Sequence, residues 1–171
     1  MPNLGITGTL AESMPRELCP EVNTTAAASG TLNMQLIYLQ AGTLVSNITL
    51  ASATTAAGTP TNYFFALYDA SRNLLAQSAN QTTTAWAANT VKTLAMTTPY
   101  RVPTSGPYYI GYMMTATTVA TIKGGTARTG GQLTAAAPIV YGTSTTGLTT
   151  AMPNPAAAIT SSTASLYAAV S

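Results

Sequence analysis

The chain has 171 residues, of which 6% are charged, with no histidine, one cysteine and a formal net charge of +2 at pH 7. Ordinary soluble domains carry about 25% charged residues, so this surface has little electrostatic protection against association, and an oligomer is expected. The length suits one sizeable domain with an attached arm.

Residues 1–29 are predicted to form an extended N-terminal arm, because their apolar side chains are too few to build a core. Residues 11–18 predict one helical turn, with Ser13 as its cap and Pro15 in its first turn. The arm is expected to dock on a partner. The residues expected to contact that partner are Leu4, Ile6, Leu10, Glu12, Arg16, Glu17, Leu18 and Glu21.

Cys19, the one cysteine, excludes an intrachain disulfide. A small buried or half-buried thiol is the simpler interpretation, and an intermolecular disulfide is the alternative.

The charge of the chain is unevenly distributed. Three of the four acidic residues lie in the arm, whereas the rest of the chain carries five basic residues and one aspartate. We therefore expect an acidic arm that reaches a basic surface on a partner or on a neighbouring copy. Five scattered basic residues do not form a nucleic-acid patch, and no apolar run approaches membrane-spanning length. Neither nucleic acid nor a membrane is expected as a partner.

Residues 30–171 are predicted to form the body, in which short apolar strands alternate with turn signals. Gly124-Gly125 is expected to end a strand that begins at Val119. Long loops are predicted at 53–61, 79–90 and 143–158. In chain order, the predicted strands are 32–36, 45–50, 62–68, 74–76, 91–99, 108–115, 119–122, 139–141 and 164–170.

The stretch 62–78 is predicted to be the hairpin at the centre of the core, since it holds both phenylalanines. Residues 63, 65 and 67 fall on one face of an extended chain, and residues 64, 66 and 68 fall on the other. Residues 69–73 have turn chemistry, because Asp, Ser and Asn side chains can hydrogen-bond to the nearby backbone.

These elements indicate an all-β fold, a single antiparallel β-sandwich of jelly-roll-like type with an extended N-terminal arm. A parallel sheet with crossover helices would need amphipathic helical segments, which the sequence lacks. Trp86, in a polar loop, is predicted to cover one end of the core.

The residue types used in catalysis are nearly absent. A chain without histidine lacks the commonest general base and metal ligand. One cysteine and four acids do not assemble a zinc or calcium site. Asp69 is the only acidic residue of the body, whereas glycoside hydrolysis needs two facing carboxylates. No enzymatic activity, cofactor or metal is expected.

Four stretches of the chain after residue 30 carry a combined pattern of strands and turns. They are Leu39-Gln-Ala-Gly-Thr-Leu-Val-Ser-Asn-Ile-Thr, Phe65-Ala-Leu-Tyr-Asp-Ala-Ser-Arg-Asn-Leu-Leu-Ala-Gln-Ser, Thr98-Pro-Tyr-Arg-Val-Pro-Thr-Ser-Gly-Pro-Tyr-Tyr-Ile-Gly and Leu166-Tyr-Ala-Ala-Val-Ser. On these stretches, the run from Gly42 to Gly124 resembles a domain of virion proteins from tailed phages, in particular phages of high-GC Gram-positive hosts. The resemblance covers most of the chain after residue 30. The resemblance implies a jelly-roll-like β domain on a phage particle, often multimeric, in either the head or the tail.

Two hypotheses follow for function. In the first, the chain is a capsid decoration protein that binds the major capsid protein or another virion protein through its arm. It multimerises on the particle surface, most simply as a homotrimer, after assembly in the host cytoplasm. In the second, it is a minor tail or head-fibre protein that binds cell-surface glycans. Trp86 and Tyr141 are the candidate contacts for the second hypothesis, although core packing is the simpler role for the aromatic residues.

Overall fold

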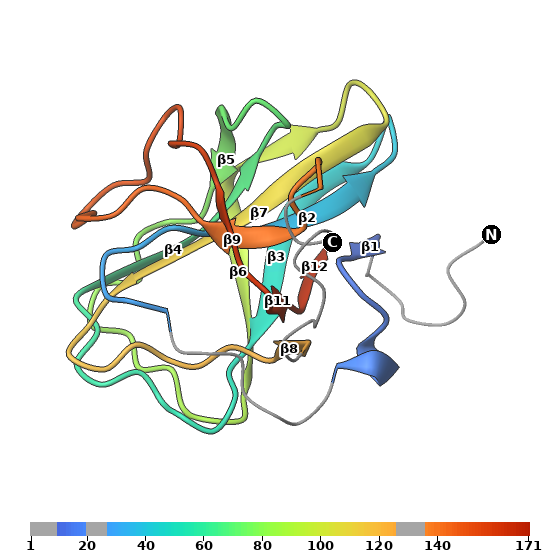
Figure 1. Cartoon of the computed structure of the whole chain (residues 1–171). Helices are drawn as coiled ribbons and strands as arrows, with labels where there is room; N and C mark the ends of the chain where they lie inside the picture. Colours follow the sequence, from blue (N-terminus) through green and yellow to red (C-terminus); the bar gives the residue numbers. More distant parts are fainter. Residues whose placement is uncertain (1–9, 20–26, 126–135) are drawn as a thin grey trace.

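The computed structural model describes residues 10–19, 27–125 and 136–171, which form strands connected by loops, with one short 3-10 turn, η1 (Arg16–Leu18) (Figure 1). The all-β prediction is confirmed. The strands are β1 (Ala11–Glu12), β2 (Asn33–Leu39), β3 (Leu44–Ala51), β4 (Asn62–Tyr68), β5 (Leu74–Gln77), β6 (Val91–Arg101), β7 (Gly106–Thr115), β8 (Gly124–Gly125), β9 (Tyr141–Thr143), β10 (Thr160–Ser161), β11 (Ser165–Leu166) and β12 (Ala168–Val170).

Two antiparallel sheets pack against each other as a β-sandwich (Figure 1). The smaller sheet has the order β1-β12-β3-β6, and the larger one has the order β10-β9-β2-β7-β4-β5. A short pair, β11-β8, lies beside them. Consecutive strands such as β2 and β3, or β6 and β7, belong to different sheets. The chain therefore crosses repeatedly between the layers, and most contacts join residues that are distant in sequence.

The predicted hairpin is present as β4 and β5. Its turn is closed by Asp69, whose carboxylate accepts hydrogen bonds from the backbone N–H and the side-chain amide of Asn73, each at 2.8 Å. Arg72 takes the left-handed conformation with φ 69°. The expected turn chemistry therefore explains how the chain reverses here.

Strand β4 is buried on both faces. Tyr63, Phe65 and Leu67 contribute to the core between the two sheets. Phe64, together with Ala66 and Tyr68 on the same face, contributes to a second core on the outer side of the larger sheet. The predicted division of the strand into two faces is confirmed, and its lack of polar alternation reflects burial on both sides.

Residues 144–159, here called the strap, cover this outer side. The sequence predicts a long loop at these positions, and the chain is indeed without a named strand from 144 to 159. The strap nevertheless buries Met152 and Ala156 against the sheet. Hydrogen bonds tie it down: the Tyr68 hydroxyl donates to the Pro153 carbonyl at 3.1 Å, and the Ala156 N–H donates to the Arg72 carbonyl at 3.0 Å. Because the strap caps the second core, the larger sheet is covered on both faces.

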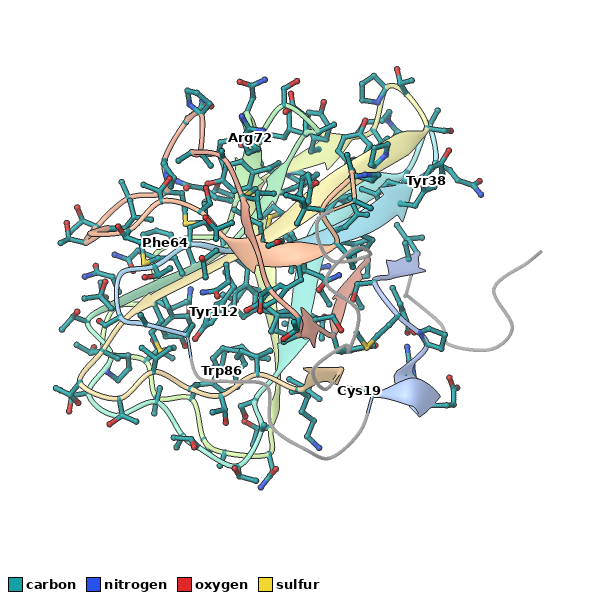
Figure 2. The ribbon with its side chains drawn as sticks, viewed as in Figure 1. Cys19, Tyr38, Phe64, Arg72, Trp86 and Tyr112 are labelled. Carbon is teal, nitrogen blue, oxygen red and sulfur yellow. The ribbon has the colours of Figure 1, made fainter. Side chains whose placement is uncertain are left out.

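Trp86 closes one end of the main core, as predicted (Figure 2). Its ring centroid lies 6.0 Å from that of Tyr63, 5.6 Å from that of Phe65 and 6.1 Å from that of Tyr112. The Lys92 ammonium lies 5.7 Å from the Trp86 centroid and donates to the Tyr63 hydroxyl at 2.8 Å. The lysine thus caps the aromatic cluster while its charge stays hydrogen-bonded.

Two predicted strands and one predicted strand end differ from the structure. Gly124-Gly125 does not end a strand but forms β8, paired with β11. A side chain at Gly124 would collide with the carbonyl oxygen of Ser165, so glycine permits this close approach. Within 119–122, Ile122 makes only an isolated bridge to Ser52. The strand predicted at 139–141 is displaced to Tyr141–Thr143, where it pairs with β2.

Replacing Trp86 with alanine is expected to lower the free energy of unfolding by about 3–5 kcal/mol, because it empties the centre of the aromatic cluster. Val91→Ala is the matched control: Val91 is 70% exposed, so its truncation should change stability by only about 0.5 kcal/mol. Urea denaturation of both variants measures the difference. Equal losses in the two variants would contradict the assignment of Trp86 to the core.

Candidate functional site

Residues 10–19, here called the arm root, lie against the C-terminal strand β12 (Figure 1). Ala11 is paired with Val170, and Glu12 with Ala169. The Leu10 N–H donates to the Val170 carbonyl at 2.8 Å. Residues 11–12 therefore belong to the sandwich, and the prediction that all of 1–29 lies outside it is wrong at these positions. The physical reason is that β12 presents unpaired backbone groups at its edge, and the arm root satisfies them.

Ser13 joins the arm root to the same strand with its side chain. Its Oγ accepts a hydrogen bond from the Ala168 N–H at 2.9 Å and donates to the Leu166 carbonyl at 2.9 Å. The prediction that Ser13 caps a helical turn is therefore wrong. The turn that does form, Arg16–Leu18, follows Pro15 and has no side-chain cap.

Glu12 is engaged within its own chain. Its Oε1 forms an ion pair with Arg16 and accepts a hydrogen bond from the Tyr167 hydroxyl at 3.1 Å. Burial raises the pKa of Tyr167, which keeps the hydroxyl protonated as the donor, while the nearby Arg16 opposes this shift. The carboxylate thus fastens the arm root to the C-terminal segment and is not a free acidic group for a partner.

Cys19, at the end of the arm root, is a free and half-buried thiol, as predicted (Figure 2). Burial raises its pKa, and the charge of Lys123 opposes the shift. A raised pKa lowers the thiolate fraction and with it the reactivity of the sulfur. An intermolecular disulfide at Cys19 stays a prediction.

Of the residues predicted to contact a partner, the structure brings Glu12 and Arg16 together as an ion pair. Leu10 and Glu17 also lie in the arm root. Leu10 is 50% exposed and Glu17 is exposed. Leu18 lies in the 3-10 turn. The other three predicted contacts, Leu4, Ile6 and Glu21, lie outside the described residues.

The two residues predicted to contact glycans are buried. Trp86 is 1% exposed and Tyr141 is 6% exposed. The Tyr141 hydroxyl donates to Asn33 Oδ1 at 3.0 Å, as a satisfied core tyrosine does. Neither ring offers a face to a ligand, so these two glycan contacts are wrong and the packing interpretation is confirmed.

Tyr38 is an exposed aromatic residue that the sequence analysis does not single out. Its side chain is 65% exposed and lies at the edge of the body (Figure 2). It stands near the end of β2, opposite Pro107 of β7. The strand pattern places Tyr38 on the same face as the buried Met34, so the sequence alone suggests that it belongs to the second core. The strap does not extend over it.

The described residues contain no cluster of three or more His, Cys, Asp or Glu side chains placed to hold a metal ion. In the same part of the chain, no helix is long and apolar enough to cross a membrane.

Comparison with known proteins identifies no relative of this chain. No protein-family model, no curated protein and no solved structure matches the chain. Fold and site together define an all-β sandwich whose N-terminal segment is hydrogen-bonded to its C-terminal strand.

Stability is expected to fall at alkaline pH, in part through Tyr141, because burial raises the pKa of this residue to about 12. The pKa of an unfolded tyrosine is about 10. Between these two values the unfolded chain loses a proton that the folded chain keeps. The contribution of Tyr141 to the free energy of unfolding is therefore fully present below about pH 10, and above it that free energy falls by up to about 1.4 kcal/mol per pH unit. Burial also raises the pKa values of Tyr68 and Tyr112. Urea denaturation from neutral to strongly alkaline pH should show a shallower decline for Tyr141→Phe than for the wild-type chain, and equal slopes would contradict the assignment.

Proposed function

We propose that this chain is a structural virion protein of a tailed phage, a capsid decoration protein that binds the shell through its N-terminal arm and multimerises on the particle surface. The observation that carries the proposal is the fastening of the arm root to β12. The resemblance of the body to virion proteins of tailed phages supplies the class of particle.

The arm root gives the N-terminal segment a defined point of attachment. Backbone bonds from Leu10 and Ser13, the two bonds of the Ser13 hydroxyl and the Glu12 contacts hold it to the C-terminal segment. The nine residues before Leu10 include the apolar Leu4 and Ile6. Fully extended, nine residues span about 30 Å. The proposed anchor on the shell is therefore residues 1–9, a shorter segment than the arm predicted from the sequence.

The body supports self-association through its lack of charge. Only 6% of the chain is charged, and its net charge of +2 produces little repulsion between copies. A homotrimer is the proposed stoichiometry, and the major capsid protein is the proposed partner of the arm.

Deletion of residues 1–9 is expected to abolish coating of particles while leaving the thermal unfolding temperature nearly unchanged, because every arm-root contact is kept. Co-sedimentation of purified protein with undecorated particles measures the coating. A matched variant with Leu4→Asp and Ile6→Asp keeps the chain length and should also fail to coat.

Deletion of residues 1–19 is the informative comparison, because it removes β1 and leaves the β12 edge unpaired. This longer deletion should lower the unfolding temperature, whereas the shorter one should not. If the chain lacking residues 1–9 coats particles normally, the arm is not the anchor.

A second candidate function is favoured by one observation, the 65% exposure of Tyr38. In this alternative the chain is a minor tail or head-fibre protein, and Tyr38 supplies the stacking face for a cell-surface glycan. Saturable binding of the protein to host cells that is lost in Tyr38→Ala and kept in Val91→Ala would support it. Absence of binding by the wild-type chain would eliminate it.

A further inference from the structure

The side chains that respond to acid are concentrated in one stretch of this chain, residues 12–21. Glu12, Glu17 and Glu21 are three of its four acidic residues, Asp69 is the fourth, and the chain has no histidine. Aspartate, glutamate and histidine are the side chains that take up protons between neutral and acidic pH. Acidification therefore changes few charges in the body and acts mainly on the N-terminal segment.

Glu12 holds the arm root through its negative charge. Its Oε1 forms the ion pair with Arg16 and accepts the hydrogen bond from the Tyr167 hydroxyl at 3.1 Å. The ion pair stays within the arm root, whereas the Tyr167 bond crosses to the C-terminal segment, between β11 and β12. A protonated carboxyl loses its charge for Arg16 and is a weaker acceptor for Tyr167.

The other bonds of the arm root to the C-terminal segment do not depend on charge. The backbone N–H groups of Leu10 and Ser13 donate to the carbonyls of Val170 and Ala168 at 2.8 Å each. The Ser13 hydroxyl bonds to Ala168 and Leu166. Strand β1 is two residues long and lies at the edge of its sheet. Because such an edge element opens at a lower free energy than the core, the loss of one charged contact shifts its opening equilibrium measurably.

The ionisable groups around Glu12 make it the acid-sensitive member of this cluster. Besides Arg16 and Tyr167, they are Glu17 and Cys19, which act electrostatically on Tyr167, and Lys123, which acts on Cys19 from the segment before β8. Among these residue types, only glutamate takes up a proton between neutral and acidic pH.

The only acidic residue of the body acts elsewhere. The carboxylate of Asp69 holds the β4–β5 turn through Asn73, in the larger sheet. Its protonation therefore acts on that hairpin and not on the arm root.

We propose that the arm root is an acid-sensitive latch: protonation of Glu12 weakens its hold, and residues 10–19 leave β12 while the sandwich stays folded. The contribution of the Glu12 carboxylate to the latch is present at neutral pH and is lost as the pH falls and the carboxyl takes up a proton. Release of a segment by a change of charge is a common form of conformational switch.

The latch goes beyond the proposed function, because it concerns the arm root itself and applies to any partner of the N-terminal segment. Residues 10–19 span about 35 Å when fully extended, so their release lengthens the reach of this segment. Release also leaves the edge of β12 without its partner strand β1.

The test is amide hydrogen exchange of the purified full-length chain, with no phage particle present, at about pH 6 and about pH 3, on either side of the usual glutamate value of about 4.3. The protection factor is the ratio of the intrinsic to the observed exchange rate, so it removes the direct effect of pH on exchange. The N–H groups of Leu10, Ser13 and Ala168 report on the latch. The N–H of Val102, which donates to the Thr43 carbonyl at 2.8 Å, reports on the body. Acidification should lower the first three protection factors at least about tenfold, as expected for the loss of a hydrogen bond to a charged group.

Glu12→Gln keeps the size of the side chain and removes its charge. This variant should show low arm-root protection already at about pH 6, with little further loss at about pH 3. Glu17→Gln is the matched control, because Glu17 is exposed and lies in the same arm root, and it should behave as the wild-type chain does. Thermal unfolding at neutral pH verifies that both variants are folded.

A local loss of protection on acidification that Glu12→Gln reproduces at about pH 6 supports the latch. Arm-root protection that does not change with pH overturns it, and so does an equal loss at Val102, which would mean that acid unfolds the whole body. A Glu12→Gln variant that keeps the wild-type pH dependence, or a Glu17→Gln variant that loses it, overturns the assignment to Glu12. Because no particle is present, failure of the latch is separate from failure of the coating experiment.

Discussion

The larger sheet must be covered on both of its faces, and the rest of the structure depends on this constraint. Strands β4 and β7 are apolar on both sides, so one layer of partners cannot bury them. The smaller sheet and Trp86 cover one face, and the strap covers the other. Burying a large aromatic or aliphatic side chain contributes about 1.5–3 kcal/mol. The two cores together therefore explain how a chain with so few charges and one short 3-10 turn among its described residues holds a defined shape.

The same arrangement separates the surfaces that remain for function. With the strap on one side, Tyr38 at the end of β2 and Leu10 in the arm root are exposed among the described residues. The arm root links the N-terminal segment to the last strand of the body, so a load on the arm passes into the sheet through hydrogen bonds to Ala168 and Val170. This fastening suits the proposed role of the N-terminal segment as an anchor on a shell.

Much of the fold could be predicted from local patterns, and the misses have physical causes. The 62–78 hairpin could be predicted, because Asp69 and Asn73 specify a turn between two apolar runs. The role of Ser13 could not be predicted. In sequence, a serine that caps a nearby helical turn and a serine that bonds to a distant strand look identical. Tyr38 lies on the same face of β2 as Met34, and only the extent of the strap decides which of the two is covered. In sequence, Gly124 has the pattern of a strand breaker. Its place in a strand depends on a close approach to Ser165, which is a tertiary contact that the sequence does not show.

The central claim is that many copies of this chain coat a phage head. Quantitative mass spectrometry of purified virions, calibrated against the major capsid protein, tests it most directly. The account predicts a copy number of the same order as that of the major capsid protein. A handful of copies per particle would contradict it and would place the chain in the tail or in a head fibre.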